Sequence, residues 1–237
     1  MSKQLPGQTA VVTGAASGLG FAFARALAAE GANVVIADME DVAGKVAEGN
    51  ISPDHGVAAF YKVDVSRRDE VRSLIDFVIG RFHHLDILIN NAGLQYISPI
   101  HEFDEDRWDH LIAVMLTGTF LTSRYALPHM MAQKHGRIIN IASVHGLVAS
   151  EFKSAYVAAK HGVLGFTKVL ALEGAPYGIT AVSVCPSYAR TALVDKQIDA
   201  LAKLQNVPRD DVVERVMLGA VPFKHLLDPE EVASLVV

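Results

Sequence analysis

Short apolar runs alternate with longer amphipathic stretches along most of this chain. Runs typical of buried strands lie at 9–12, 34–37, 58–63, 87–89, 137–141 and 180–184. Stretches with helical spacing lie between or after them, at 21–30, 68–82, 104–133 and 155–174. Because strands alternate with helices, the pattern predicts an α/β fold, a doubly wound parallel sheet with helices on both faces.

Composition narrows the class of protein. The 237 residues are 51% hydrophobic and show no linker or repeat, which predicts a single domain over 1–237. The net charge of −5 provides no basic field, so we expect no nucleic-acid partner. The single cysteine, Cys185, excludes a disulfide framework and is expected to be a small buried side chain. No apolar run reaches membrane-spanning length and the N-terminus lacks a signal-peptide core, so we expect a soluble, cytoplasmic protein without a membrane partner.

A glycine-rich turn separates the first apolar run from the first helical stretch. Its sequence is Thr13-Gly14-Ala15-Ala16-Ser17-Gly18-Leu19-Gly20. Glycines allow a pyrophosphate to approach the backbone, and the amides at the start of the following helix can bind it. A plain tight turn is the alternative, but strand, turn and helix together favour a dinucleotide site. The candidate cofactor-binding residues here are Thr13, Gly14, Ser17, Gly18, Leu19 and Gly20.

A second group, Ser143, Tyr156 and Lys160, indicates proton transfer. Tyr156 and Lys160 are four residues apart and share one face of a predicted helix. A phenol normally keeps its proton until about pH 10, and a neighbouring ammonium favours the phenolate, so we expect Lys160 to lower the pKa of Tyr156. Ser143 could hold a substrate oxygen against that phenol. Combined with a nucleotide site, this group predicts hydride transfer at an alcohol carbon.

Both motifs resemble the short-chain dehydrogenase/reductase family, which implies a Rossmann-type fold. The Gly-x-x-x-Gly-x-Gly spacing matches that family, as do Asn90-Asn91-Ala92-Gly93 after the fourth apolar run and Cys185-Pro186-Ser187-Tyr188-Ala189-Arg190-Thr191 after the sixth. The resemblance implies that Lys160 holds the cofactor ribose and Thr191 the nicotinamide carboxamide. It also assigns the following residues to the cofactor cleft: Asp64, Val65, Asn91, Ala92, Gly93, Tyr156 and Pro186.

Asp38, at the end of the second apolar run, favours NAD over NADP. A carboxylate at this place accepts hydrogen bonds from the adenosine ribose and repels a 2′-phosphate. Neither 15–17 nor 39–40 supplies the arginine or lysine that a 2′-phosphate requires. The alternative role for Asp38 is to cap the helix that follows it.

The residues around the proton-transfer group indicate a small carboxylate substrate. Lys153 lies three residues before Tyr156 and His145 two after Ser143, so a cation and a histidine should lie near the reacting carbon. Six positions are similar to the substrate residues of the (R)-3-hydroxybutyrate dehydrogenases of this family: Gln95, Ser143, His145, Lys153, Tyr156 and Gln197. The resemblance implies interconversion of (R)-3-hydroxybutyrate and acetoacetate. The alternative substrates are a polyol, a sugar or a 3-oxoacyl compound. The alternative for Lys153 is an ordinary surface lysine.

Two positions depart from the family pattern. Met115 stands where the family usually has an asparagine that supports a proton relay, and Ser187 replaces a glycine after Pro186. Met115 keeps open a further alternative, an NAD-binding sensor with little catalysis.

The remaining predictions concern the periphery. The stretch 187–225 resembles the family's substrate lid, and Asp228-Pro229-Glu230-Glu231 is typical of a helix start. The resemblance implies one more strand, for which the sequence has no residues after Val237. The helix at 155–172 is apolar almost all round, which predicts that its outer face is buried as well. The resemblance implies that this helix and the preceding long one pair between the subunits of a homotetramer. The histidines lack metal-ligand spacing, so we expect no metal site.

Overall fold

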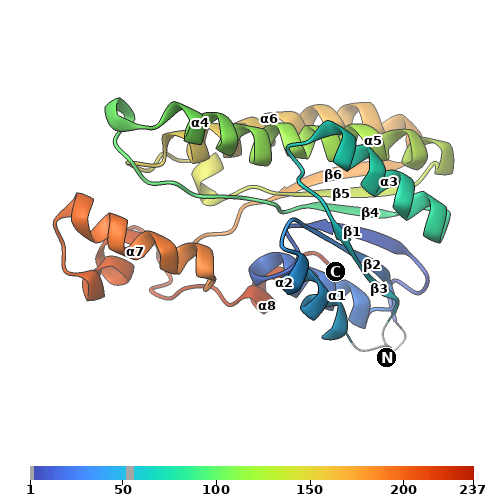
Figure 1. Ribbon diagram of the computed structural model, residues 1–237, viewed down its shortest axis with the longest axis horizontal. Helices are drawn as coiled ribbons and strands as arrows, with labels where there is room; N and C mark the ends of the chain where they lie inside the picture. Colours follow the sequence, from blue (N-terminus) through green and yellow to red (C-terminus); the bar gives the residue numbers. More distant parts are fainter. Residues whose placement is uncertain (1–2, 52–55) are drawn as a thin grey trace.

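The computed structural model describes residues 3–51 and 56–237; residues 1–2 and 52–55 of the predicted domain lie outside the described residues. Six strands form one parallel sheet in the order β3-β2-β1-β4-β5-β6 (Figure 1). Their bounds are Thr9–Thr13 (β1), Asn33–Asp38 (β2), Ala58–Lys62 (β3), Ile87–Asn90 (β4), Gly136–Ile141 (β5) and Ile179–Val184 (β6). The predicted Rossmann-type parallel sheet is confirmed.

Helices cover both faces of the sheet, because alternate residues of its strands are apolar on both sides. Ala10 and Val12 of β1 pack into one core cluster and Val11 into the other. One layer contains α1 (Gly18–Ala29), α2 (Asp41–Gly49) and α8 (Pro229–Ala233). The other contains α3 (Arg68–Phe82), α4 (Glu105–Ile112), α5 (Gly118–Gln133) and α6 (Ser154–Gly174). The two layers lie on opposite sides of the strands in Figure 1.

The strand order reverses at β1, which pairs with β2 on one side and β4 on the other. The chain therefore leaves the carboxyl ends of β1 and β4 toward opposite layers. In open parallel sheets this reversal leaves a crevice that binds ligands. The glycine turn follows β1 and Asn91 follows β4 directly, so both predicted cofactor segments meet at the crevice.

The stretch at 104–133, predicted as one helix, is interrupted. A π-helical turn at Ala113–Thr117 separates α4 from α5. Thr119 Oγ1 donates a hydrogen bond to the Met115 carbonyl at 2.8 Å, and threonine hydroxyls that bond back to helix carbonyls distort helices. Met115 lies inside the turn and is 1% exposed. Hydrophobic periodicity does not reveal this turn, because residues 112–116 are apolar throughout and leave no polar position to mark the change.

A buried polar network ties the sheet to the helix that contains Tyr156 and Lys160. Asn90 and Asn140 are partners in the β4–β5 register, and Asn90 Nδ2 donates to Asn140 Oδ1 at 2.8 Å. Asn140 Nδ2 donates in turn to Thr167 Oγ1 of α6 at 2.8 Å. Buried amides make such bonds because an unpaired polar group in the core is costly. The network fixes α6 against β4 and β5.

The stretch predicted as a lid stands apart from both helical layers. It contains α7 (Ala192–Gln205) and a π-helical segment, Val212–Met217, which share a separate apolar cluster. In Figure 1, α7 projects beyond the layers and is joined to β6 by an extended segment. The predicted helix start at Asp228 is confirmed, since the Asp228 amide donates to Glu231 Oε2 at 2.8 Å. Among the described residues, none of the helices combines the length and apolarity needed to cross a membrane.

Candidate active site

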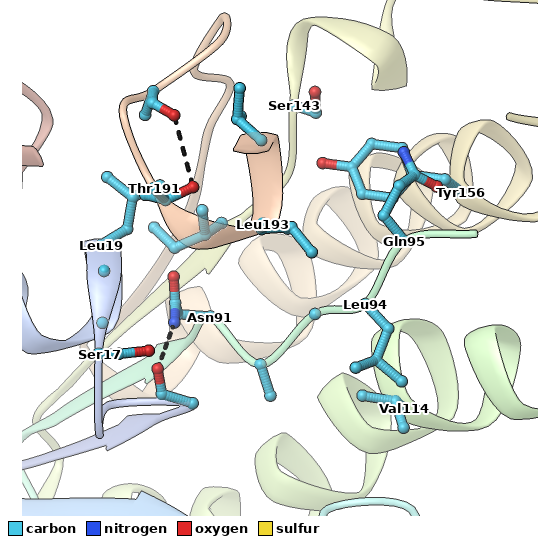
Figure 2. A pocket seen from close by; sticks show the side chains of 18 of the residues that line it. Ser17, Leu19, Asn91, Leu94, Gln95, Val114, Ser143, Tyr156, Thr191 and Leu193 are labelled. Atoms are coloured by element: carbon cyan, nitrogen blue, oxygen red, sulfur yellow. Dashed lines mark hydrogen bonds between the residues drawn. The ribbon is translucent and has the colours of Figure 1, made fainter. Parts of the chain in front are cut away.

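A cleft of about 450 Å³ lies at the carboxyl ends of the central strands, and α7 forms part of its wall. Ser17 and Leu19 of the glycine turn lie on one side of it, and Ser143 and Tyr156 on the other (Figure 2). Every predicted site residue except Thr13 lines this cleft. The chain thus brings together residues from the glycine turn, the β4 and β5 ends, α6 and α7.

The glycine turn borders the cleft and packs tightly against the chain behind it. Gly14 has φ +62° and a Cβ there would lie 2.8 Å from the Ala92 Cα, while a Cβ on Gly20 would overlap the Gly14 carbonyl oxygen. Asn91 Nδ2 donates to the carbonyls of Thr13 and Gly14 at 2.9 and 3.0 Å. The turn is therefore fixed by its neighbours, and the first amides of α1 remain available for a pyrophosphate.

Thr13, predicted to bind the cofactor directly, lies behind the cleft wall and is 2% exposed. Its Oγ1 accepts hydrogen bonds from the amides of Asn91 and Ala92 at 3.0 and 3.1 Å. Thr13 therefore joins the ends of β1 and β4, and its support of the cleft is indirect.

Asp38 borders the cleft and bonds to the chain just before α2, whose N-cap is Glu40. Its carboxylate lines the cleft, and it accepts the Ala16 amide at 2.9 Å and the Glu40 amide at 3.1 Å. The second bond precedes α2, so Asp38 helps to order the start of that helix. Each carboxylate oxygen retains acceptor capacity for a ribose hydroxyl.

Ser143, Tyr156 and Lys160 meet in the cleft because α6 packs against the end of β5. Ser143 Oγ accepts the His145 amide at 3.1 Å and is hydrogen-bonded to Tyr156. Lys160 is 4% exposed, and its Nζ donates to the Ile141 carbonyl at 2.6 Å. Tyr156 and Lys160 thus share one face of α6, as their spacing predicts.

The pKa of Tyr156 differs from expectation. Burial raises it, and the hydrogen bond from Ser143 acts in the opposite direction. Burial also lowers the pKa of Lys160 to about 8. The prediction that Lys160 lowers the pKa of Tyr156 is therefore wrong for the unliganded protein. Burial disfavours the charged form of both groups, and spacing in the sequence does not report burial.

Lys153 is a buried cation that lines the cleft and is 2% exposed, so the alternative of a surface lysine is wrong. The preceding residue, Phe152, has φ +63°, a left-handed conformation unusual for an aromatic residue. Lys153 Nζ donates to the Tyr188 hydroxyl at 3.0 Å, and burial lowers the pKa of Lys153 to about 8. Within the described parts of the chain, no carboxylate forms an ion pair with Lys153.

Three other predicted substrate residues line the same cleft. Burial, followed by the charge of Lys153, lowers the pKa of His145 to about 4, and the buried His145 Nδ1 has no partner. Gln197 of α7 is 6% exposed; its Nε2 donates to the Leu193 carbonyl at 2.8 Å, while its Oε1 has no partner. Gln95 Oε1 accepts the Tyr96 amide at 3.1 Å. Buried polar atoms without partners at a cleft indicate that a polar ligand supplies them.

Tyr188 lines the cleft beside Lys153 and was not predicted from the sequence. It contacts Lys153, and its hydroxyl lies 3.3 Å from His145 Nε2. The only available signal was its place between Pro186 and Thr191, two residues that the resemblance already assigned to the cofactor cleft.

Comparisons with known proteins agree with this geometry. The model of the short chain dehydrogenase family matches residues 8–202. An uncharacterized oxidoreductase of Bacillus subtilis, YxjF, is 46% identical over 97% of this chain and 90% of its own. The D-beta-hydroxybutyrate dehydrogenase of Cupriavidus necator is 43% identical over 98% of this chain and 90% of its own. The crystal structure of NAD+-bound xylitol dehydrogenase superposes with a TM-score of 0.94 at 29% identity, over 99% of this chain and 92% of that one. With its fold, glycine turn and Ser143-Tyr156-Lys160 group, this chain belongs to the short-chain dehydrogenase family.

Proposed function

We propose that this dehydrogenase is NAD-dependent and interconverts (R)-3-hydroxybutyrate and acetoacetate. The observation that carries the substrate assignment is the Lys153 ammonium, buried in the cleft with no carboxylate partner in residues 3–51 and 56–237. An ammonium has three N–H donors, and one of those on Lys153 is used by Tyr188. A buried charge is costly unless it is paired, so the remaining donors favour an anionic substrate over a polyol or sugar.

The polar groups around Lys153 suit a small carboxylate. Among the described residues, His145 Nδ1 lacks a partner, and Gln95 and Gln197, whose amide nitrogens carry N–H donors, line the same cleft. Ser143 and Tyr156 lie beside His145, so a substrate held by its carboxylate would place an alcohol a few bonds away against the phenol. The relative from Cupriavidus necator, named D-beta-hydroxybutyrate dehydrogenase, supports this choice among hydroxy acids.

The cleft fits NAD. Gly14 and Gly20 pack closely against the chain's own backbone, so the turn borders the cleft with main-chain atoms, as a pyrophosphate site requires. Asp38 offers a carboxylate to the adenosine ribose and repels a 2′-phosphate. The structurally similar xylitol dehydrogenase binds NAD+, which supports the same cofactor here.

When bound, NAD supplies the hydride acceptor. Ser143 orients the substrate oxygen, and Tyr156 exchanges a proton with it: the phenolate removes the hydroxyl proton during oxidation, and the phenol returns it during reduction. Lys160 donates to Ile141 and keeps two further N–H groups for ribose hydroxyls and for stabilising the phenolate. The raised pKa of Tyr156 makes the phenol the resting form.

The methionine at position 115 leaves the proton-transfer group in place. Its side chain is buried, and its carbonyl already accepts the Thr119 hydroxyl. Ser143, Tyr156 and Lys160 remain together in the cleft, which favours an enzyme over a sensor.

The protein is a homotetramer in this proposal, with 187–225 as the substrate lid. Phe120 of α5 and Leu172 of α6 are 44% and 77% exposed, and both lie in the helical layer that the family resemblance assigns to subunit contacts. Light scattering that shows a stable monomer would contradict the tetramer.

NADH formation at a nicotinamide absorbance band tests the activity, with NAD and (R)-3-hydroxybutyrate as substrates. The (S) enantiomer and NADP are run in parallel. We expect turnover that is selective for the (R) form and for NAD. Lys153→Ala should abolish turnover of the carboxylate and leave oxidation of a neutral secondary alcohol nearly unchanged. Equal loss with both substrates would contradict a carboxylate site.

A further inference from the structure

The Tyr188 hydroxyl lies between two polar groups of the cleft. It is 3.0 Å from Lys153 Nζ and 3.3 Å from His145 Nε2. The Tyr188 ring is also 4.7 Å, centre to ammonium, from Lys153. Tyr188 reaches both groups across the cleft, since it follows β6 whereas the other two lie between β5 and α6.

Counting protons gives the direction of each bond. An ammonium can only donate, so the Tyr188 oxygen accepts from Lys153. The phenol then has one proton to give. His145 Nε2 and the hydroxyl of Ser150 are the two neighbours that can accept it. An imidazole nitrogen is the more basic of the two, so the proton is directed at His145.

His145 must then be neutral, with its own proton on Nδ1. This agrees with its pKa of about 4, which burial and Lys153 produce. Tyr188 itself keeps its proton, because burial raises its pKa to about 12. The buried Nδ1, which has no partner among the described residues, is therefore an N–H donor, and a substrate carboxylate would supply its missing acceptor.

We infer that Tyr188 is a positioning residue: it fixes His145 as the Nδ1–H tautomer and holds the Lys153 ammonium, so that both side chains present N–H donors to the substrate carboxylate. The part of this inference that concerns the substrate carboxylate rests on the proposed function. The tautomer does not, since it follows from contacts of the unliganded protein.

Nitrogen-15 NMR of histidine-labelled protein tests the tautomer without any substrate. The chain has 10 histidines, so the ring signals of His145 are identified by their loss in His145→Asn. We expect a neutral ring protonated on Nδ1 at pH 7 in the wild type. In Tyr188→Phe, which keeps the ring and removes the hydroxyl, we expect a shift toward the Nε2–H form. An Nε2–H ring in the wild type, or the same tautomer in both proteins, would overturn the inference.

Steady-state kinetics tests the role in binding. Tyr188→Phe should raise the KM for 3-hydroxybutyrate about tenfold and leave kcat within about twofold, because the lost bonds orient the groups that bind the carboxylate. The affinity for NAD should be unchanged, which also reports that the variant is folded. Tyr61→Phe is the matched control, since Tyr61 is half-buried on β3 and does not line the cleft. An unchanged KM in Tyr188→Phe would contradict the inference.

The two proposals fail in different ways. If the wild type does not oxidise 3-hydroxybutyrate but His145 is the Nδ1–H tautomer and depends on Tyr188, the substrate assignment fails and the positioning role remains.

Discussion

The Lys160 ammonium lies 5.6 Å from the centre of the Tyr156 ring and makes its short hydrogen bond to the Ile141 carbonyl, at 2.6 Å. The sheet therefore holds Lys160 beside the phenol before any ligand binds. No hydrogen bond between the two side chains is present among the described residues. Lys160 is placed to stabilise a phenolate once it forms, while the buried phenol keeps its proton at rest.

Removing the Tyr156 hydroxyl should abolish the reaction. We expect Tyr156→Phe to lower kcat by about three orders of magnitude or more, because the proton then has no acceptor beside the substrate oxygen. The Kd for NAD, measured by calorimetry, should stay within about twofold of the wild type. Tyr61→Phe should change neither quantity. Substantial turnover by Tyr156→Phe would remove Tyr156 from the mechanism.

The pH dependence should report the charge of Lys153. Its pKa in the unliganded protein is about 8, and only the protonated form attracts a carboxylate. The KM for 3-hydroxybutyrate should therefore be lowest below pH 8 and rise above it. The KM for a neutral secondary alcohol should lack this rise. His145, with a pKa of about 4, stays neutral from pH 6 to 9 and should not contribute.

Lys153 should also lower the free energy of unfolding of the unliganded protein. Its folded pKa of about 8 lies below the ordinary value of 10.5, so at pH 7 the folded state holds a charge that it disfavours. We expect Lys153→Met to raise the free energy of unfolding in urea by about 1–3 kcal/mol at pH 7. The gain should shrink by pH 10, where folded Lys153 is already neutral.

Lys203→Met is the matched control for this stability change. Lys203 is exposed on α7, so its replacement should leave the free energy of unfolding nearly unchanged at both pH values. A destabilised Lys153→Met would mean that the ammonium has a compensating partner in the folded protein.

Asp38 should set the choice between NAD and NADP. Asp38→Asn keeps an oxygen acceptor for the Ala16 amide but removes the negative charge near a 2′-phosphate. We expect the ratio of kcat/KM for NADP to that for NAD to rise about 10- to 100-fold, since like charges at an interface cost several kcal/mol. Glu40→Gln makes the same charge change two residues away and should have a smaller effect. Equal effects of the two variants would indicate general repulsion by the cleft.

The buried network under α6 should contribute to stability. Asn140→Ala removes one of two acceptors of Asn90 Nδ2 and one of two donors to Thr167 Oγ1, in a site that is 0% exposed. We expect the free energy of unfolding to fall by about 2–4 kcal/mol in denaturant titrations. Asn50→Ala, at an exposed position after α2, should change it by less than about 0.5 kcal/mol. A loss at Asn140 as small as that at Asn50 would contradict this role of the network.

The parallel sheet, its two helical layers and most residues of the cleft could be predicted from the order of residues alone. Strands buried on both faces must be apolar throughout, so their positions are visible as apolar runs. The glycine turn and the Ser143-Tyr156-Lys160 group are recognised by their residue types and spacing, which can be seen in the sequence. Four features depend on how distant residues pack together and could not be predicted. They are the π-helical turn at Met115, the burial of Lys153, the raised pKa of Tyr156 and the indirect role of Thr13. Tyr188 reaches Lys153 from 35 residues away. Burial and the partners of a side chain are properties of the packed molecule, and they determine which of its polar groups remain free for a substrate.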